Sequence, residues 1–273
     1  MISVLITYYN RKKHLLNTMR SYALTKLPKE EVEFLIMDEE SDSEHQLHQE
    51  DFSEFGFLVR LFRVARLGDC PVIQPNDMFL RSVGDIIVLQ NPECIPVGDV
   101  LSCVADRAGR GRYLSFECYN STPDYADRLF SEFTGESSSG AIKSLVEPVV
   151  QACATSDFSP GWYNHRIHRP LGYHFLSALT RKDFELLNGF DERFAPGVAY
   201  GDDEFIFRVR KLLRVVFVGE PFCIHQQHPQ TSYLRPFAKE KQERNKQLLQ
   251  DVVVRDMYKS PLGIAEHRMV ELL

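Results

Sequence analysis

Long apolar runs are missing from this 273-residue sequence, and so is an excess of positive charge. No stretch approaches the roughly 20 apolar residues that a membrane-spanning helix needs. The first apolar run, residues 2–6, is too short for a signal peptide and precedes its positive charges rather than following them. Lys and Arg total 32 against 38 Asp and Glu, which argues against a general binder of nucleic acid or anionic membranes. We therefore expect a cytoplasmic protein, and the sequence is compatible with peripheral association with a membrane.

Cysteine pairs are missing as well. The six cysteines include no C-x-x-C motif and stand among apolar neighbours, at positions 70, 94, 103, 118, 153 and 223. We expect buried free thiols of a reducing compartment rather than disulfides. A hydrophobic content of 44% over this length is enough for one large globular domain, which we expect to carry a short tail.

Strand-like and helix-like patterns alternate from the start. Residues 2–6 form an apolar β-rich run, a helical pattern follows through Ala23, and residues 32–37 form a second apolar run. This β-α-β order predicts a parallel sheet with polar residues at its strand ends, where such sheets bind ligands. Later patterns predict strands at 57–64, 85–89, 113–119 and 215–218 and helices at 78–83, 97–108, 182–188 and 200–213. Residues 120–160 are irregular, residues 172–180 are apolar again, and an amphipathic helical tail follows Pro236.

Three consecutive acids, Asp202, Asp203 and Glu204, follow a Gly-Phe-Asp turn in the segment GFDERFAPGVAYGDDEFIFR, residues 189–208. They open an apolar helix with i, i+3, i+4 spacing. Acids near a helix N-terminus stabilise its dipole, but capping alone requires one acid and not three beside a glycine. The pattern predicts a carboxylate base at the mouth of a pocket.

This segment resembles the C-terminal half of nucleotide-sugar-dependent glycosyltransferases with the GT-A fold, especially inverting family 2 and the related galactosyl- and N-acetylgalactosaminyltransferases. Their usual motif is Glu-Asp-x-Asp with an Arg beyond it. Counting back from Arg208 places the catalytic Asp on Asp202 and the following acid, a substrate contact, on Glu204. A slip of one residue leaves Asp203 as a competitor for the base.

The resemblance covers about residues 1–228 and implies a fold and an activity. The fold is α/β, a Rossmann-like three-layer GT-A sandwich around a mostly parallel twisted sheet. Residues 1–235 would form this domain, with a nucleotide-binding half at 1–95 and an acceptor and catalytic half at 96–235. The remaining 236–273 would be a helical extension that packs on the domain or forms a homodimer. The activity would be inverting transfer of a hexose or N-acetylhexosamine from a nucleotide diphosphate sugar, with UDP favoured, to a hydroxyl of a glycan or glycoconjugate.

Two loops resemble the family's nucleotide-binding half, Thr7-Tyr8-Tyr9-Asn10 after the first strand and Asp38-Glu39-Glu40-Ser41-Asp42 after the second. The resemblance implies that Asp38 accepts a hydrogen bond from a pyrimidine N3–H and that Tyr8 or Tyr9 stacks on the base. Further donor contacts are expected from Thr7, Asn10, Asp42, Arg66, Asn76 and Asn91.

The family's Asp-x-Asp metal motif is missing. Gln90-Asn91-Pro92-Glu93 stands in its place and leaves Glu93 as a carboxylate ligand. His225 and His228 resemble the histidine pair that completes the metal site in the galactosyl- and N-acetylgalactosaminyltransferases. We expect Mn²⁺, or Mg²⁺, with imidazole favouring the transition metal. A metal-free site is left open.

Aromatic residues at 162–165 offer a wall for a sugar ring, with Trp162, Tyr163 and His165 as candidate substrate contacts. Burial in the core is the alternative for these rings. A catalytically silent glycan- or nucleotide-binding module is a second hypothesis, which the lost Asp-x-Asp favours. A nucleotidyltransferase is a weaker third one, because Arg11-Lys12-Lys13 lacks the glycines of a phosphate-binding loop.

Overall fold

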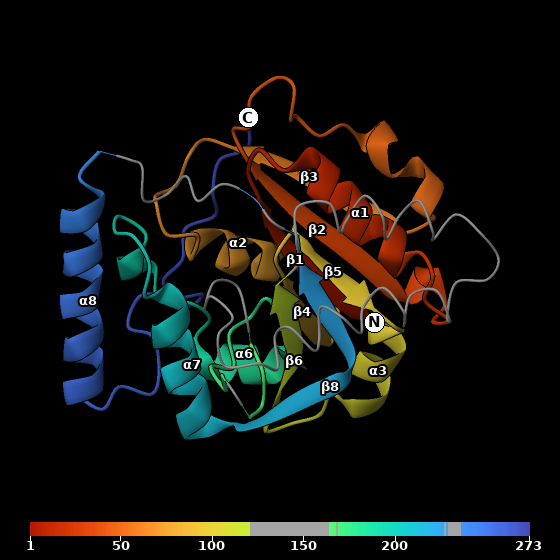
Figure 1. Cartoon of the computed structure of the whole chain (residues 1–273). Coiled ribbons are helices and arrows are strands. Elements are labelled where there is room, and N and C mark those ends of the chain that lie inside the picture. Colours follow the sequence, from red (N-terminus) through yellow and green to blue (C-terminus); the bar gives the residue numbers. More distant parts are fainter. Residues whose placement is uncertain (121–163, 168, 227, 229–235) are drawn as a thin grey trace.

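One mixed sheet of eight strands runs through the protein, in the order β3-β2-β1-β4-β7-β6-β8-β5 (Figure 1). The computed structural model describes residues 1–120, 164–167, 169–226, 228 and 236–273. The strands are β1 (Ile2–Tyr8), β2 (Val32–Glu39), β3 (Leu58–Val64), β4 (Ile86–Gln90), β5 (Cys94–Val97), β6 (Arg112–Asn120), β7 (Leu176–Thr180) and β8 (Arg214–His225).

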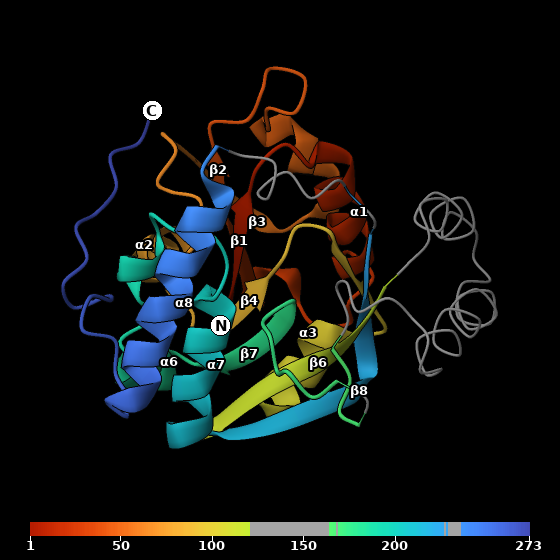
Figure 2. The same cartoon turned by 60° about the vertical axis from the view of Figure 1, so that its left-hand side comes forward.

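Helices cover both faces of this sheet, so that the molecule has three layers (Figure 2). The 3₁₀ helix η2 (Gln49–Phe55), α1 (Lys12–Tyr22) and α3 (Val100–Arg107) bury their apolar residues with one core cluster. The second cluster contains the apolar faces of α2 (Ile73–Arg81), α6 (Arg181–Leu187) and α7 (Gly201–Leu212). Short 3₁₀ helices lie at η1 (Lys29–Glu31) and η3 (Glu192–Phe194).

The α/β three-layer fold expected from the sequence is confirmed, with a sheet that is more mixed than expected. Among the described strands, β3, β2, β1 and β4 are mutually parallel, and β6 is parallel to β8. Strands β7 and β5 run antiparallel to their neighbours. The parallel half therefore brings the carboxyl ends of β1, β2 and β4 to one edge, as the sequence predicted.

The extension after residue 236 is helical only in its first part, α8 (Ala238–Val254), which lies against α7 in both views. Val252 is buried, and Leu248 and Leu249 pack on the second core cluster. The apolar face that suggested a dimer contact is thus used within the chain. No helix among the described residues is long and apolar enough to cross a membrane.

Residues 255–273 return across the α2 side as a segment we call the C-terminal strap. Asn188 binds it from the end of α6, donating to the Ser260 carbonyl at 2.9 Å and accepting from the Ile264 N–H at 3.2 Å. Farther along, the N–H of Leu273 donates to the Arg63 carbonyl on β3 at 2.8 Å. The strap therefore joins elements that are distant in sequence.

Candidate active site

A pocket of about 560 Å³ opens at the carboxyl ends of β1, β2 and β4. Its wall comes from the loops after these strands, from segments 66–75, 169–175 and 198–203, and from His228. Nine residues that the sequence singled out line it together: Thr7, Tyr8, Tyr9, Arg66, Asn91, Glu93, Asp202, Asp203 and His228. Amino acids from both ends of the chain thus meet in one cavity.

Of the two acids at the end of β2, Glu39 lines the pocket and Asp38 does not. Asp38 pairs in register with Tyr8 and is buried, and its carboxylate accepts the Ser41 N–H at 3.0 Å. Glu39, whose side chain points to the opposite face, lines the pocket. Glu39 is therefore a second candidate for the base contact, and the role of Asp38 stays a prediction.

Glu39 is held by two donors, the Leu67 N–H at 2.7 Å and the Gln74 amide at 2.8 Å. Burial raises the pKa of Glu39, although these hydrogen bonds and the nearby Arg66 oppose the rise. The sequence contained a signal for Glu39. Successive side chains of a strand point to opposite faces of the sheet, so Asp38 and Glu39 cannot face the same side.

Arg66 and Tyr9 lie together on the pocket wall, with the guanidinium carbon 5.5 Å from the ring centroid. Arg66 also donates to Asp69 at 3.1 Å. Asn10 and Asp42 instead bind each other at 2.6 and 2.8 Å, outside the lining. They join the loops after β1 and β2 rather than reaching the cavity.

Asn76, a predicted donor contact, is fully buried and lies outside the pocket. Its amide donates to the Phe190 carbonyl and to Glu192, both at 2.9 Å, and its oxygen accepts the Phe190 N–H at 2.8 Å. The residue fixes the Gly-Phe-Asp turn from α2. Asn76 therefore makes structural contacts in this fold.

Glu93, His225 and His228 form a compact group whose ligand atoms all lie within 4.8 Å of one another. Glu93 Oε1 faces the Nε2 atoms of His225, at 3.3 Å, and His228, at 3.7 Å. The pairing of β5 with β8 produces this contact, since Cys94, which follows Glu93, lies opposite His225. A carboxylate oxygen and two imidazole nitrogens suit Mn²⁺ or another transition metal.

Arg11, which the sequence did not mark as a site residue, contacts Glu93 and His228. Its Nη1 lies 2.8 Å from Glu93 Oε2, and its Nη2 lies 3.3 Å from His228 Nδ1. Burial raises the pKa of Glu93, but Arg11 and the two histidines outweigh it and hold that pKa well below its usual value. Glu93 is therefore a carboxylate, and its Oε1 remains directed at the histidines.

Asp202 and Asp203 also line the pocket, at the start of α7. The side chain of Asp202 is 49% exposed, and Oδ1 lies 3.4 Å from His174 Nε2. Asp203 accepts a short hydrogen bond from the Tyr173 hydroxyl. Burial raises the pKa of Asp203, and the charge of Asp202 adds to the rise while the Tyr173 bond opposes it.

A strained backbone presents these acids. Ala199 and Tyr200, directly before α7, have φ angles of 60° and 64°. Non-glycine residues adopt this left-handed region at an energetic cost, which the surrounding structure must offset. Asn245 of α8 does so by donating to the Ala199 carbonyl at 2.9 Å and the Phe194 carbonyl at 3.0 Å.

Glu204, predicted to contact substrate, is buried against Arg208. The guanidinium of Arg208 donates to Glu204 Oε2 at 2.7 Å and to the carbonyls of Leu187 and Gly189 at 2.7 and 2.9 Å. The pair thus anchors the end of α6 to α7, and the substrate role is corrected to a structural one. The i, i+4 spacing of an acid and an arginine was the signal for it.

The predicted sugar wall is only partly described. His165 lies outside the pocket lining, with its Nε2 3.7 Å from Glu117 Oε1 and its ring edge-on to Tyr119. Trp162 and Tyr163 lie outside the described residues.

Comparison with known proteins rests on structure, since no protein-family model matches the chain and no curated protein matches its sequence. TarS from S. aureus, as its fragment 1–349, has a TM-score of 0.62 at 12% identity over 97% of this chain and 67% of its own. A mannosyltransferase from Pyrobaculum calidifontis has a TM-score of 0.55 at 14% identity over 95% of this chain. The chain has the GT-A fold.

The relatives with this GT-A fold are larger than the chain, which spans 65% of the length of the mannosyltransferase. GalNAc-T7 has a TM-score of 0.57 at 15% identity, and the chain spans 49% of it. The mannosyltransferase was solved with GDP-Man and Mn²⁺, TarS with UDP-GlcNAc, and GalNAc-T7 with UDP, GalNAc and Mn²⁺.

Proposed function

We propose that this chain is a metal-assisted, inverting glycosyltransferase that moves a hexose or N-acetylhexosamine from a nucleotide diphosphate sugar to an acceptor hydroxyl. One observation carries the proposal: a single cavity is lined by Glu93 and His228 and also by Asp202 and Asp203. A cation site and a carboxylate base in one pocket are what such a displacement requires. The bound nucleotide sugars of the structural relatives support this chemistry for the fold.

The nucleotide would lie over the ends of β1 and β2. Glu39 is the acceptor we assign to a pyrimidine N3–H, and Tyr9 offers its ring as a stacking surface beside Arg66. UDP is the nucleotide we favour. Arg66 and Arg11 supply positive charge for phosphate oxygens in a chain whose net charge is −6.

The residues present fit a divalent cation, because Glu93 Oε1 and the two Nε2 atoms converge while Arg11 occupies the other carboxylate oxygen. Glu93, His225 and His228 would hold Mn²⁺, which supplies neutralisation of the charge that develops on the leaving diphosphate. To bind the ion, Nε2 of His228 must be unprotonated, so the proton of the neutral imidazole must lie on Nδ1. The Arg11 contact to Nδ1 must then give way, because a guanidinium has no acceptor.

Asp202 is the base we assign. It lines the cavity and is half-exposed, and the Tyr173 hydroxyl donates to Asp203 rather than to Asp202. A carboxylate in this place can accept the proton of an acceptor hydroxyl as that hydroxyl attacks the face of the sugar opposite the diphosphate. His174, 3.4 Å away, would orient the carboxylate.

Incubation with a panel of UDP- and GDP-sugars and simple glycan acceptors, with Mn²⁺ or with EDTA, tests the proposal. We expect nucleotide diphosphate release that depends on Mn²⁺ and a product of inverted anomeric configuration by NMR. Retained configuration would eliminate the single-displacement mechanism, and equal release in EDTA would eliminate the metal.

A catalytically silent binding module is the second candidate, favoured by the ion pair between Arg11 and Glu93, because Arg11 occupies one of the two carboxylate oxygens of Glu93. The same experiment separates the two functions. Tight UDP binding by calorimetry with no nucleotide release from any sugar, in the presence of acceptors, would favour the silent module.

A further inference from the structure

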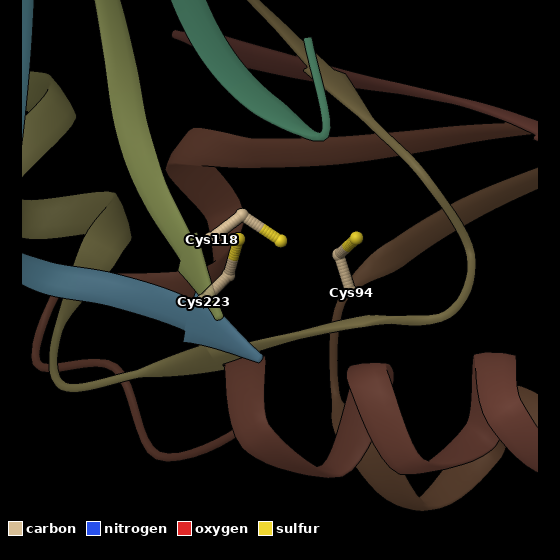
Figure 3. A group of neighbouring side chains, drawn as sticks. All are labelled: Cys94, Cys118 and Cys223. Atoms are coloured by element: carbon tan, nitrogen blue, oxygen red, sulfur yellow. The ribbon is translucent and has the colours of Figure 1, made fainter. Parts of the chain in front are cut away.

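Three cysteines converge in the core next to the Glu93–histidine group. Cys94 comes from β5, Cys118 from β6 and Cys223 from β8 (Figure 3). All three are 0% exposed, and their sulfur atoms lie within 4.8 Å of one another. A single buried thiol packs as a small hydrophobic group. Three sulfur atoms that converge from three strands differ from a single thiol, because one ion between them can contact all three.

The spacing of these sulfur atoms is close to that of a metal–thiolate site. A Zn–S bond of about 2.3 Å places tetrahedral thiolate sulfurs about 3.8 Å apart. The separations here are at most 4.8 Å. Small rotations about the Cα–Cβ bonds would therefore bring the three sulfurs onto one ion, without a change in the pairing of the strands.

We propose that Cys94, Cys118 and Cys223 bind a thiophilic d¹⁰ cation, Cu⁺ or Zn²⁺, through three sulfur ligands. Soft thiolates select these ions over Mn²⁺ and Mg²⁺, so the site would not compete with the pocket for its cation. Among the described residues no fourth His, Cys, Asp or Glu joins the group. Three ligands complete the trigonal coordination that is common for Cu⁺. Zn²⁺ would neutralise more of the charge of the three thiolates and so leave less net negative charge in the core.

The position of the trio gives the ion a structural consequence. Cys94 directly follows Glu93, and Cys223 lies two residues before His225 on the same strand. An ion bound by the three sulfurs would cross-link β5, β6 and β8 beneath the pocket. This inference concerns sulfur chemistry in the core and does not rest on the proposed transferase activity.

Retention of the ion is the first measurement. Because the site is fully buried, we expect loading during folding and slow exchange afterwards. The full chain is produced in medium supplemented with Zn²⁺ or with copper, purified under reducing conditions, desalted and assayed by elemental mass spectrometry. We expect about one ion per chain in one of the two preparations, and the preparation that retains it identifies the metal.

X-ray absorption on that preparation tests the ligands without any substitution. We expect a first shell of sulfur alone. A shell of nitrogen and oxygen would assign the ion to Glu93, His225 and His228 and overturn the proposal. The absence of retained ion from both preparations would overturn it as well, and would mean that the three thiols only pack.

Substitutions provide the residue assignment. Cys94→Ala, Cys118→Ala and Cys223→Ala should each lower retention at least 10-fold, whereas Cys103→Ala, a half-buried cysteine outside the trio, and Glu93→Gln should leave it unchanged. Circular dichroism shows whether each variant is folded. If a variant does not fold, the X-ray absorption spectrum of the wild-type protein still identifies the ligands of the ion. Retention lost in Glu93→Gln but kept in all three trio variants contradicts the proposal.

Discussion

Asp202 and Asp203 are adjacent in sequence, but their carboxylates have different surroundings. Asp202 is half-exposed in the cavity, while Asp203 is engaged by the Tyr173 hydroxyl and has its pKa raised, chiefly by burial. An amide in place of a carboxylate keeps the shape of the side chain and removes its basicity, so asparagine substitutions separate the two roles.

We predict that Asp202→Asn lowers turnover by roughly 10²-fold or more while UDP affinity stays within a few-fold, because only proton acceptance is lost. Nucleotide release and calorimetry measure the two quantities. Asp203→Asn is the matched variant and should lose much less turnover. If Asp203→Asn is inactive and Asp202→Asn is active, the base lies one residue farther along α7.

Glu39→Gln should weaken UDP binding by about 1.5–3 kcal/mol, the usual contribution of a hydrogen bond to a charged group. Asp38→Asn is the control, because Asp38 lies outside the pocket on the other face of β2. Calorimetry with UDP compares the two. Greater loss in Asp38→Asn than in Glu39→Gln would favour the interpretation made from sequence.

Arg11→Gln should tighten Mn²⁺ binding roughly 10-fold, because it removes a positive charge next to the cation ligands and keeps a hydrogen-bond donor for Glu93. UDP binding in EDTA should weaken in the same variant, since a phosphate contact is lost. Titration of free Mn²⁺ by electron paramagnetic resonance and calorimetry measure these opposite effects. Weaker Mn²⁺ binding would show that Arg11 orients Glu93 rather than competing with the ion.

The sequence identified several residues that line the pocket, but not the contacts that each of them makes. Acid clusters and the H-x-x-H pair predicted positions that the fold brings to one cavity. Glu39 lines the pocket, whereas Asp38, the preceding residue, does not. Asn76 and Glu204 are buried in structural contacts, and buried polar residues that fix a turn look like binding residues in a sequence. Arg11 left no signal, since its partners are more than 80 residues away.

Helix α8 contacts two loops of the pocket, and neither contact could be read from its amphipathic pattern. Lys241 forms an ion pair with Asp69 in the loop beside Arg66, and Asn245 holds the carbonyls of Phe194 and Ala199. Gly197 leaves room for this amide, since a Cβ there would lie 2.0 Å from Asn245 Oδ1. The helix is therefore a support for the strained turn before the acids.

We predict that Asn245→Ala lowers turnover roughly 10-fold through misplacement of the acids, while UDP affinity stays nearly unchanged. The exposed Gln247→Ala on the same helix is the control. Measuring the turnover number and the UDP dissociation constant separately distinguishes positioning from general destabilisation. A lower melting temperature with unchanged turnover would limit Asn245 to a structural role.

Long regular elements were predictable because their apolar periodicity extends over several turns or residues, as in α7 and β2. The short strand β5, four residues containing Pro96, was missed, since its order comes from pairing with β8. Helix α2 begins at Ile73 rather than near Met78 because Pro75 is tolerated in a first turn. Local patterns cannot reveal elements that distant partners stabilise.

Across the whole molecule, the C-terminal strap joins α2 to the Gly-Phe-Asp turn through His267. Its Nδ1 lies 2.6 Å from Glu192, and its Nε2 lies 3.1 Å from Asp77. Burial lowers the pKa of His267, but the two carboxylates outweigh it and raise the pKa to about 9. The imidazolium is therefore part of the folded structure at neutral pH.

Because the folded-state pKa lies above the usual 6.5, this contribution to stability is complete below about pH 6.5 and is lost as pH rises through about 9. We predict that His267→Gln removes on the order of 3 kcal/mol at pH 6 and much less at pH 9.5. Urea unfolding at both values measures it, with exposed Glu271→Gln as the control. An equal loss at both pH values would show that charge is not involved.

The ion pair between Lys241 and Asp69 spans 172 residues, and the strap reaches as far back as β3. A ribosome adds about 5–20 residues per second, so the loop that carries Asp69 emerges roughly 10–30 seconds before the helix that supports it. Until then, the apolar surface that α8 later covers is exposed on the nascent chain. The loop before the acids gains its support from Asn245 only after α8 has been synthesised, late in translation.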